Sequence, residues 1–166
     1  MWDILYFKAT STIERNALMF YILLVTVIIL GEWKIKNYIE ATYDGSRQEL
    51  VAKNKIRLRK YHNFGAFLNI MEKRKKILHA ISVVFTLVIA VIFLVTLFHK
   101  GNRVLKLGLS LLLGGAFSNT YDRLSRNYVV DYFSFCSPFP KLNRIVFNIS
   151  DFCIIIGTLL TVLSSS

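Results

Sequence analysis

Four apolar runs separated by polar segments are the most regular pattern along the chain. They cover residues 17–36, 77–98, 104–121 and 145–163. The second run alone has 22 residues, and a helix of that length spans about 33 Å, enough to cross the hydrocarbon core of a bilayer. The third run contains small residues that let neighbouring helices approach closely, at Gly108, Gly114, Gly115 and Ala116. The pattern predicts an all-α membrane protein, with four transmembrane helices in an antiparallel bundle and one domain over residues 1–166.

The polar segments predict where the chain leaves the hydrocarbon. Residues 37–76 contain a turn signal at Asp44–Ser46 and alternate apolar and basic side chains at Ile56–Arg59. We therefore expect a small β-containing cradle on the membrane surface between the first two spans. Residues 127–143 contain two prolines and are predicted to be a loop. Residues 1–16 are predicted to be either an interfacial segment or a disordered tail.

Composition supports the membrane class. Hydrophobic residues make up 54% of the chain, and there are 13 Phe and 8 Tyr, which is more apolar than a soluble protein of this size. Cys136, Cys153 and the scattered histidines lack metal-ligand spacing, so no metal or cofactor is predicted. The net charge of +11 comes from basic residues that punctuate the apolar runs. This distribution favours contact with membrane phospholipid over nucleic acid.

Polar and charged side chains recur at corresponding ends of the apolar runs. An antiparallel bundle brings these ends to one face, where we expect Glu32, Lys36, Asn63, Asn119, Asp122, Arg123, Asn148 and Asp151. Asn119 and Arg123 are four residues apart, and Asn148 and Asp151 are three apart, so each pair is predicted to share a helix face if the helix extends over both residues. Ionisable groups at membrane depth are costly, which makes this face a candidate functional site.

Three carboxylates, Asp122, Asp131 and Asp151, are predicted to reach this face. Asp122 adjoins Arg123 and is expected to form an ion pair with it, which leaves Asp131 and Asp151 as the freer pair. Two carboxylates in one low-dielectric site share a proton, so one can polarise a carbonyl while the other activates water. This arrangement suits amide hydrolysis without a covalent intermediate. A satisfied polar network that only fixes helix register is the alternative interpretation of the same residues.

Three sequence blocks carry a resemblance to a known family. They are Gly-Gly-Ala-x-x-Asn-x-x-Asp-Arg at 114–123, Val-Val-Asp at 129–131 and Phe-Asn-x-x-Asp at 147–151, with a weaker match, Asn-x-Gly-Ala, from Asn63. In this order and spacing they resemble the lipoprotein signal peptidases, or signal peptidase II, which are bacterial intramembrane aspartyl proteases with four spans. The similarity extends from Glu32 to Gly157.

The resemblance implies a role for each residue of the predicted face. Asp131 and Asp151 would be the catalytic pair, and the residues that orient the substrate and this pair would be Asn63, Asn119, Arg123 and Asn148. Asp122, Glu32 and Lys36 would give structural support. The implied substrates are prolipoproteins with a diacylglyceryl group on a cysteine, cleaved just before that cysteine. The implied setting is a monomer in the bacterial cytoplasmic membrane, with the site near the extracytoplasmic face.

Several features depart from the family pattern. Glu32 stands where the family usually has Asp, while Ser118 and Asn127 stand where it usually has Gly. The loop expected outside the cell is rich in Lys and Arg, so the positive-inside rule alone predicts the inverted orientation. A catalytically silent paralogue that binds lipoprotein or phospholipid is therefore an alternative function. A proton-coupled carrier is a weaker one, because carriers place their acids near the membrane centre rather than at span ends.

Overall fold

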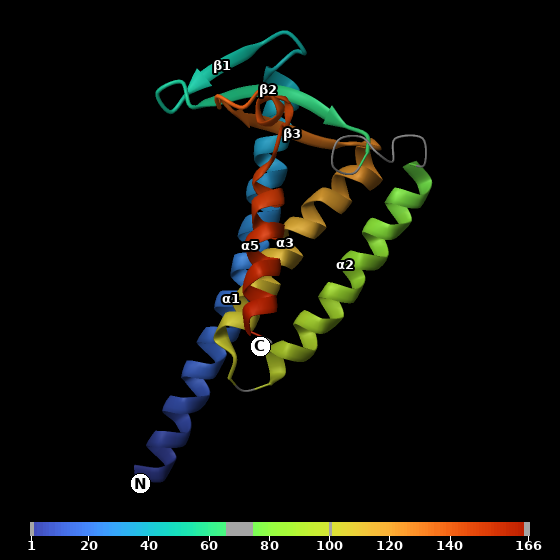
Figure 1. Ribbon diagram of the computed structural model, residues 1–166. Helices are drawn as coiled ribbons and strands as arrows, with labels where there is room; N and C mark the ends of the chain where they lie inside the picture. Colours follow the sequence, from blue (N-terminus) through green and yellow to red (C-terminus); the bar gives the residue numbers. More distant parts are fainter. Residues whose placement is uncertain (1, 66–74, 100, 165–166) are drawn as a thin grey trace.

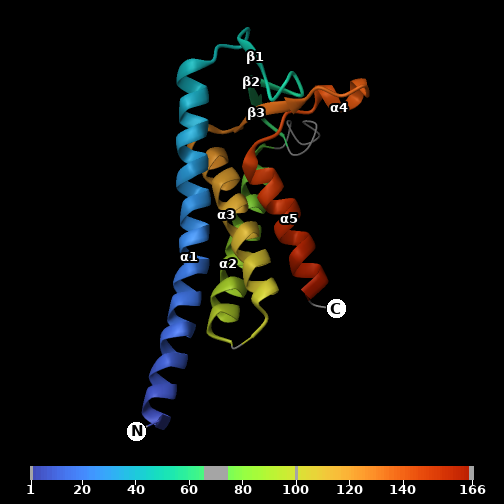
Figure 2. The ribbon, with the colours of Figure 1, turned by 90° about the vertical axis from the view of Figure 1, so that its left-hand side faces the viewer.

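The computed structural model describes residues 2–65, 75–99 and 101–164. Within them the chain forms α1 (Trp2–Thr42), β1 (Gln48–Val51), β2 (Ile56–Asn63), α2 (Lys75–Phe98), α3 (Arg103–Arg126), β3 (Val129–Phe135), α4 (Pro140–Arg144) and α5 (Ile149–Ser164). The four long helices pack lengthwise, and the sheet lies across one end of the bundle, away from the two chain ends (Figures 1 and 2). The fold is therefore mostly helical, with one small sheet.

Large apolar side chains face outward from the bundle. Among the described residues, two helical stretches are long and apolar enough to cross a membrane, Asn16–Thr42 and Lys76–Phe98, and α5 is a shorter apolar helix. Leu23 and Leu87 are each about 60% exposed, as are many of their neighbours. An apolar exterior of this extent is suited to lipid rather than water. The prediction of a membrane protein is thus confirmed, and the count of four spans stays a prediction.

Helix α3 lies at the centre of the bundle and packs against α1, α2 and α5. Its contact with α5 is close enough that a Cβ added at Gly108 would lie 2.9 Å from the Gly157 carbonyl oxygen, and one at Gly115 would lie 2.5 Å from the Ser150 carbonyl oxygen. The prediction that small residues allow a close approach is confirmed. This contact brings the end of α3 beside the start of α5, where polar residues of the predicted site lie.

The sheet is antiparallel, with strand order β1-β2-β3. Strands β1 and β2 lie in the predicted cradle, but the prediction of a loop over residues 127–143 is wrong, because β3 and α4 occupy most of it. The segment Val129–Phe135 is rich in β-branched and aromatic residues, which favour strands. Both prolines follow β3, and Pro140 opens α4, a position that tolerates its missing N–H.

The predicted boundaries of three helices need correction. Helix α1 is continuous from Trp2 to Thr42, so residues 2–16 are neither a disordered tail nor a separate segment, and the loop begins after Thr42 rather than at Asn37. Helix α3 continues to Arg126, where Asn127 ends it with a left-handed φ of 66°. Helix α5 begins at Ile149, four residues later than predicted, because the preceding residues lie against β3.

Candidate active site

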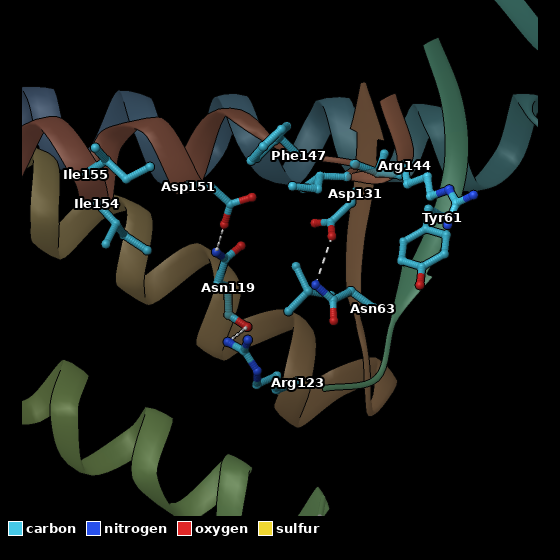
Figure 3. A pocket seen from close by; sticks show the side chains of 13 residues that line it. Tyr61, Asn63, Asn119, Arg123, Asp131, Arg144, Phe147, Asp151, Ile154 and Ile155 are labelled. Carbon is cyan, nitrogen blue, oxygen red and sulfur yellow. Dashed lines mark hydrogen bonds between the residues drawn. The ribbon is translucent and has the colours of Figure 1, made fainter. Parts of the chain in front are cut away.

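A pocket of about 250 Å³ opens where α3, α5 and the sheet meet (Figure 3). It contains five of the predicted site residues: Asn63, Asn119, Arg123, Asp131 and Asp151. The rest of its wall is largely apolar, from Val129, Ile145, Val146, Phe147, Ile154 and Ile155, with Tyr61 and Arg144 at the sheet side. Residues from Asn63 to Asp151, far apart in the chain, thus converge at one end of the bundle, where the sequence predicted a polar face.

Asp131 enters the pocket from β3 and is 1% exposed. Its two carboxylate oxygens accept hydrogen bonds from two side-chain amides, Asn63 Nδ2 at 2.9 Å and Asn148 Nδ2 at 2.7 Å. Asn63 is in position because β2 carries an extra residue between Leu58 and Tyr61 in its pairing with β3. Such a β-bulge re-aims the side chains that follow it. After the bulge Tyr61 pairs with Asp131, and Asn63 lies diagonally across from it.

Asp151 enters the pocket from the first turn of α5. Its carboxylate accepts hydrogen bonds from Asn119 Nδ2 at 3.0 Å and from the backbone N–H of Asn148 at 3.1 Å, while Asn148 Oδ1 accepts the backbone N–H of Asp151 at 3.0 Å. This reciprocal arrangement is a capping box, which satisfies backbone groups at a helix start. The helix face predicted for these two residues required the helix to extend over both, and it does not, because Asn148 is the cap that precedes α5.

Asn148 contacts both carboxylates and is fully buried. Its side chain donates to Asp131 and its backbone N–H donates to Asp151. The segment before it is held on β3 by two bonds between Phe133 and Phe147, of 3.0 Å and 2.7 Å. Figure 3 shows the two aspartates directed into the same pocket from β3 and α5. One asparagine therefore links the two acids across the boundary between sheet and bundle.

The surroundings of Asp131 disfavour its ionised form. Burial, followed by the charge of Asp151, raises the pKa of Asp131 from 3.8 to about 7, although the amide hydrogen bonds from Asn63 and Asn148 oppose this change. A carboxyl group with this pKa exchanges its proton near neutral pH. The pocket can therefore hold one protonated and one ionised carboxyl group, which is the requirement for general acid and general base action at one site.

Arg123 and Asp122 do not form the predicted ion pair. Arg123 faces the pocket and donates to the Asn119 carbonyl oxygen at 3.4 Å, whereas Asp122 turns away behind the pocket. The cationic partners of Asp122 are Lys36 at 3.1 Å and Arg126 at 3.3 Å, and it also accepts the backbone N–H of Val130. Helix geometry explains the difference, because residues i and i+4 lie side by side and adjacent residues do not.

Lys36 lies behind the pocket and is 1% exposed. Its ammonium group donates to Ser118 Oγ at 3.0 Å and to Asn119 Oδ1 at 2.9 Å. Asn119 in turn donates to Asp151, so Lys36 fixes the orientation of an amide that holds a pocket carboxylate. Ser118, a departure from the family pattern, belongs to this network as an acceptor. A buried charge of this kind is stable only when it is paired and hydrogen-bonded.

Glu32 also lies behind the pocket, with two partners that the sequence interpretation missed. Its carboxylate accepts from the Tyr132 hydroxyl at 2.6 Å and from the Ser150 hydroxyl at 2.7 Å. Burial and the adjacent Glu32 raise the pKa of Tyr132, so this phenol remains protonated and donates. Strand alternation would have indicated that Tyr132 points away from the face of Asp131. It could not indicate which helix that side chain would meet.

Within the part of the chain that the structure describes, no three His, Cys, Asp or Glu side chains are grouped to hold a metal ion. The polar groups that line the pocket are instead two carboxylates, two amides, two guanidinium groups and the Tyr61 hydroxyl. Fold and site together define a helical membrane protein with a buried two-carboxylate pocket at one end of its bundle.

The comparison with known families agrees with this class. Residues 19–166 match the family described as signal peptidase (SPase) II, so the chain belongs to the signal peptidase II family and is a peptidase. It is 32% identical over 142 residues to the lipoprotein signal peptidase of Shouchella clausii, which covers 84% of this chain and 87% of that one. The lipoprotein signal peptidase of Halothermothrix orenii is 31% identical over 149 residues, with coverage of 87% and 93%.

Solved structures share the fold. A bacterial membrane enzyme determined by the in meso method at 2.3 Å resolution aligns with a TM-score of 0.73, over 87% of this chain and 86% of that chain. A second, determined by the same method at 1.9 Å, aligns with a TM-score of 0.71. Sequence identities of 20% and 21% limit this likeness to the architecture.

Proposed function

We propose that this protein is an aspartic endopeptidase that removes signal peptides from diacylglyceryl-modified prolipoproteins, cleaving just before the lipidated cysteine. The substrate class follows from the relatives, which are lipoprotein signal peptidases. The aspartic mechanism rests chiefly on one observation, the hydrogen bonding of Asn148 to both Asp131 and Asp151. A residue that bridges two buried carboxylates holds both acids at one site.

In the proposed reaction Asp131 is the acid and Asp151 the base. Asp131 has a pKa of about 7, so near neutral pH it can donate its proton to the carbonyl oxygen of the scissile peptide bond. Ionised Asp151 takes a proton from water as the water oxygen bonds to the carbonyl carbon. The tetrahedral intermediate then collapses: one of its hydroxyl protons returns to Asp131 as the carbonyl bond re-forms, the C–N bond breaks, and the leaving nitrogen takes the proton that Asp151 had accepted.

Two polar atoms near the carboxylates support a role in substrate binding. Asn63 Oδ1 and Arg123 Nε are buried, and neither has a hydrogen-bond partner among the described residues. Buried polar atoms without partners are rare and call for an explanation. A substrate peptide passing through the pocket offers an N–H to Asn63 and a carbonyl to Arg123, so we assign both to substrate orientation, with Asn119 and Asn148 orienting the acids. Asp122, Glu32 and Lys36 support the site from behind.

The proposed setting is a bacterial cytoplasmic membrane that α1, α2, α3 and α5 cross as four antiparallel spans of one domain. The sheet lies at the end of the bundle that carries the pocket, so the carboxylates lie close beneath the cradle. We assign this end to the extracytoplasmic surface from the resemblance to the family. The apolar pocket wall of Phe147, Ile154 and Ile155 suits a lipidated substrate. Phospholipid contacts the basic cradle in this arrangement, and the protein acts as a monomer.

Cleavage of a synthetic lipidated prolipoprotein by the purified protein in detergent tests the proposal. We expect the wild type to release the signal peptide, and Asp131→Asn and Asp151→Asn to lose activity singly by nearly as much as together, since they act as a unit. The same peptide without its diacylglyceryl group is the substrate control. Near wild-type cleavage by either folded variant would exclude the aspartic mechanism. Failure of the folded wild type to cleave would favour the silent paralogue.

A further inference from the structure

We propose that Tyr132 and Glu32 form a clamp behind the two pocket carboxylates, and that this clamp sets the separation of Asp131 and Asp151. Tyr132 and Glu32 are thus positioning residues, because neither touches the substrate. The inference rests on the proposed aspartic mechanism and deepens it. It concerns the face of the site opposite the pocket, which the substrate does not reach.

The first half of the clamp holds the strand. Tyr132 directly follows Asp131 in β3, and alternation along a strand sends the two side chains to opposite faces. Asp131 faces the pocket, so Tyr132 faces α1, where its hydroxyl donates to Glu32 Oε1 at 2.6 Å. The same hydroxyl accepts the backbone N–H of Ile149, the first residue of α5, at 3.1 Å. One hydroxyl group of β3 therefore contacts both α1 and α5.

The second half of the clamp holds the helix. The other oxygen of Glu32 accepts both the backbone N–H of Ser150, at 3.1 Å, and its hydroxyl, at 2.7 Å. Ser150 directly precedes Asp151. A single carboxylate on α1 thus binds the residue next to each pocket acid, Tyr132 on one side and Ser150 on the other. A change in the length of either contact moves one acid relative to the other.

The start of α5 shows how completely this clamp is engaged. The first N–H groups of a helix have no partner within the helix. In α5 the first three are bound by the Tyr132 hydroxyl, by Glu32 and by Asn148 Oδ1. The negative charge of Glu32 also interacts favourably with the positive end of the helix dipole. Glu32 is 2% exposed and Tyr132 5%, so water does not compete for these contacts.

Asn148 and the clamp hold the acids from opposite sides. Asn148 bridges the two carboxylates directly, whereas Tyr132 and Glu32 join the backbones behind them. If the clamp is loosened, β3 and α5 can separate, and the mutual repulsion that makes the two acids share a proton decreases. The predicted result is a slower chemical step and an upper limb of the pH profile at lower pH. Substrate binding should change little, because the pocket wall remains.

Tyr132→Phe tests the clamp by removing one hydroxyl and leaving the ring in place. We expect kcat to fall on the order of 10²-fold, the cost of a small misplacement of reacting groups, while KM stays within about twofold. Tyr43→Phe is the matched control. Tyr43 is also buried, and its hydroxyl also donates to a glutamate, Glu49 Oε2 at 2.8 Å, but that pair lies in the cradle outside the site. It should change neither kcat nor the pH profile.

Glu32→Gln and the double variant with Tyr132→Phe complete a mutant cycle. Glutamine supplies one acceptor oxygen where the site has three donors, so it should impair kcat as Tyr132→Phe does, and the two effects should be clearly less than additive. Additive losses would show two independent residues rather than a clamp. A loss confined to thermal stability, with kcat and both limbs of the pH profile unchanged in Tyr132→Phe, would overturn the inference.

A readout without turnover separates this inference from the proposed function. The infrared band of protonated carboxyl groups, assigned by its loss in Asp131→Asn, follows the titration of the acid pair in the absence of substrate. Tyr132→Phe should move the midpoint of that titration to lower pH, and Tyr43→Phe should leave it in place. An unmoved midpoint in Tyr132→Phe would refute the clamp. Wild-type protein that does not cleave would refute the proposed function, and the titration would still judge the clamp.

Discussion

Replacing Asp131 by asparagine should stop cleavage and, at the same time, stabilise the folded protein above neutral pH. Burial and the charge of Asp151 raise the pKa of Asp131 from 3.8 to about 7. Between these two values the folded state binds more protons than the unfolded state, so the wild type loses stability as the pH rises from about 4 to about 7. An asparagine at this position does not ionise and avoids that loss.

The size of this stability difference follows from the two pKa values of Asp131. The change from 3.8 to about 7 corresponds to about 4 kcal/mol, since each tenfold change in proton affinity is worth about 1.4 kcal/mol. The hydrogen bonds can be kept. Asn148 remains a donor to the new side chain, and Asn63 can turn its amide to accept from it, because Asn63 Oδ1 has no partner among the described residues. We therefore expect a gain of about 2 to 4 kcal/mol at pH 8 and little difference at pH 4.

Unfolding of the two proteins in detergent micelles between pH 4 and pH 8 measures this gain, with cleavage assayed on the same preparations. Asp122→Asn is the control, for which we expect a change in stability of the opposite sign. It leaves Lys36 and Arg126 without the carboxylate that lies 3.1 Å and 3.3 Å from them, so it should destabilise by about 3 kcal/mol or more. A stability difference between wild type and Asp131→Asn that stays constant from pH 4 to pH 8 would refute the reasoning.

Three further predictions concern packing, orientation and lipid. Gly115→Ala should destabilise by about 1 to 3 kcal/mol and reduce cleavage, whereas Gly31→Ala, whose Cβ meets nothing within 4 Å, should do neither; equal effects would contradict this. In a protein lacking its native cysteines, an impermeant thiol reagent outside the cell should label Asn54→Cys but not Arg103→Cys, and the reverse result would invert the proposed orientation. Neutralising Lys73–Lys76 should weaken stabilisation by anionic phospholipid by about 1 kcal/mol per charge at low salt; an unchanged response would show that these charges do not contact lipid.

The last of these predictions, on the basic cluster, is based on the sequence alone. Lys73 and Arg74 lie outside the described residues, and only the backbone of Lys75 is described. The prediction that this part of the cradle contacts anionic lipid therefore stands on its charge alone.

The length of an apolar run predicted the bounds of a helix well where polar residues flank the run on both sides. The second run was predicted at residues 77–98 and α2 spans Lys75–Phe98. The end of α1 was predicted too early because the first polar residues after the apolar run were taken to mark the end of the helix. Glu32 and Lys36 are polar and yet buried against other elements, and α1 continues beyond them to Thr42. Hydropathy cannot tell a solvated polar residue from a buried one whose partners come from distant parts of the chain.

The positions of the site residues were predictable from antiparallel order alone, but their pairing was not. Adjacency in sequence suggested that Asp122 pairs with Arg123, although the spacing of Asp122 and Arg126 already matched one turn of helix. The bulge in β2 that brings Asn63 to Asp131 leaves no clear mark in the sequence. Tyr132 was missed because its partner, Glu32, is 100 residues away.

The requirements of stability and of activity are opposed at Asp131, whereas they agree at the residues that support it. Asn148 caps α5 with the same hydrogen bonds that orient Asp151, so improving the fold at this position also improves the geometry of the acids. Glu32 and Lys36 likewise form an ion pair with each other and bind neighbouring polar groups, and these contacts also hold the elements that carry the two acids. Asp131, in contrast, is kept in surroundings that penalise its charge. The conflict expected of an active site thus lies at a residue whose proton the reaction uses, while the supporting contacts stabilise the fold and the site together.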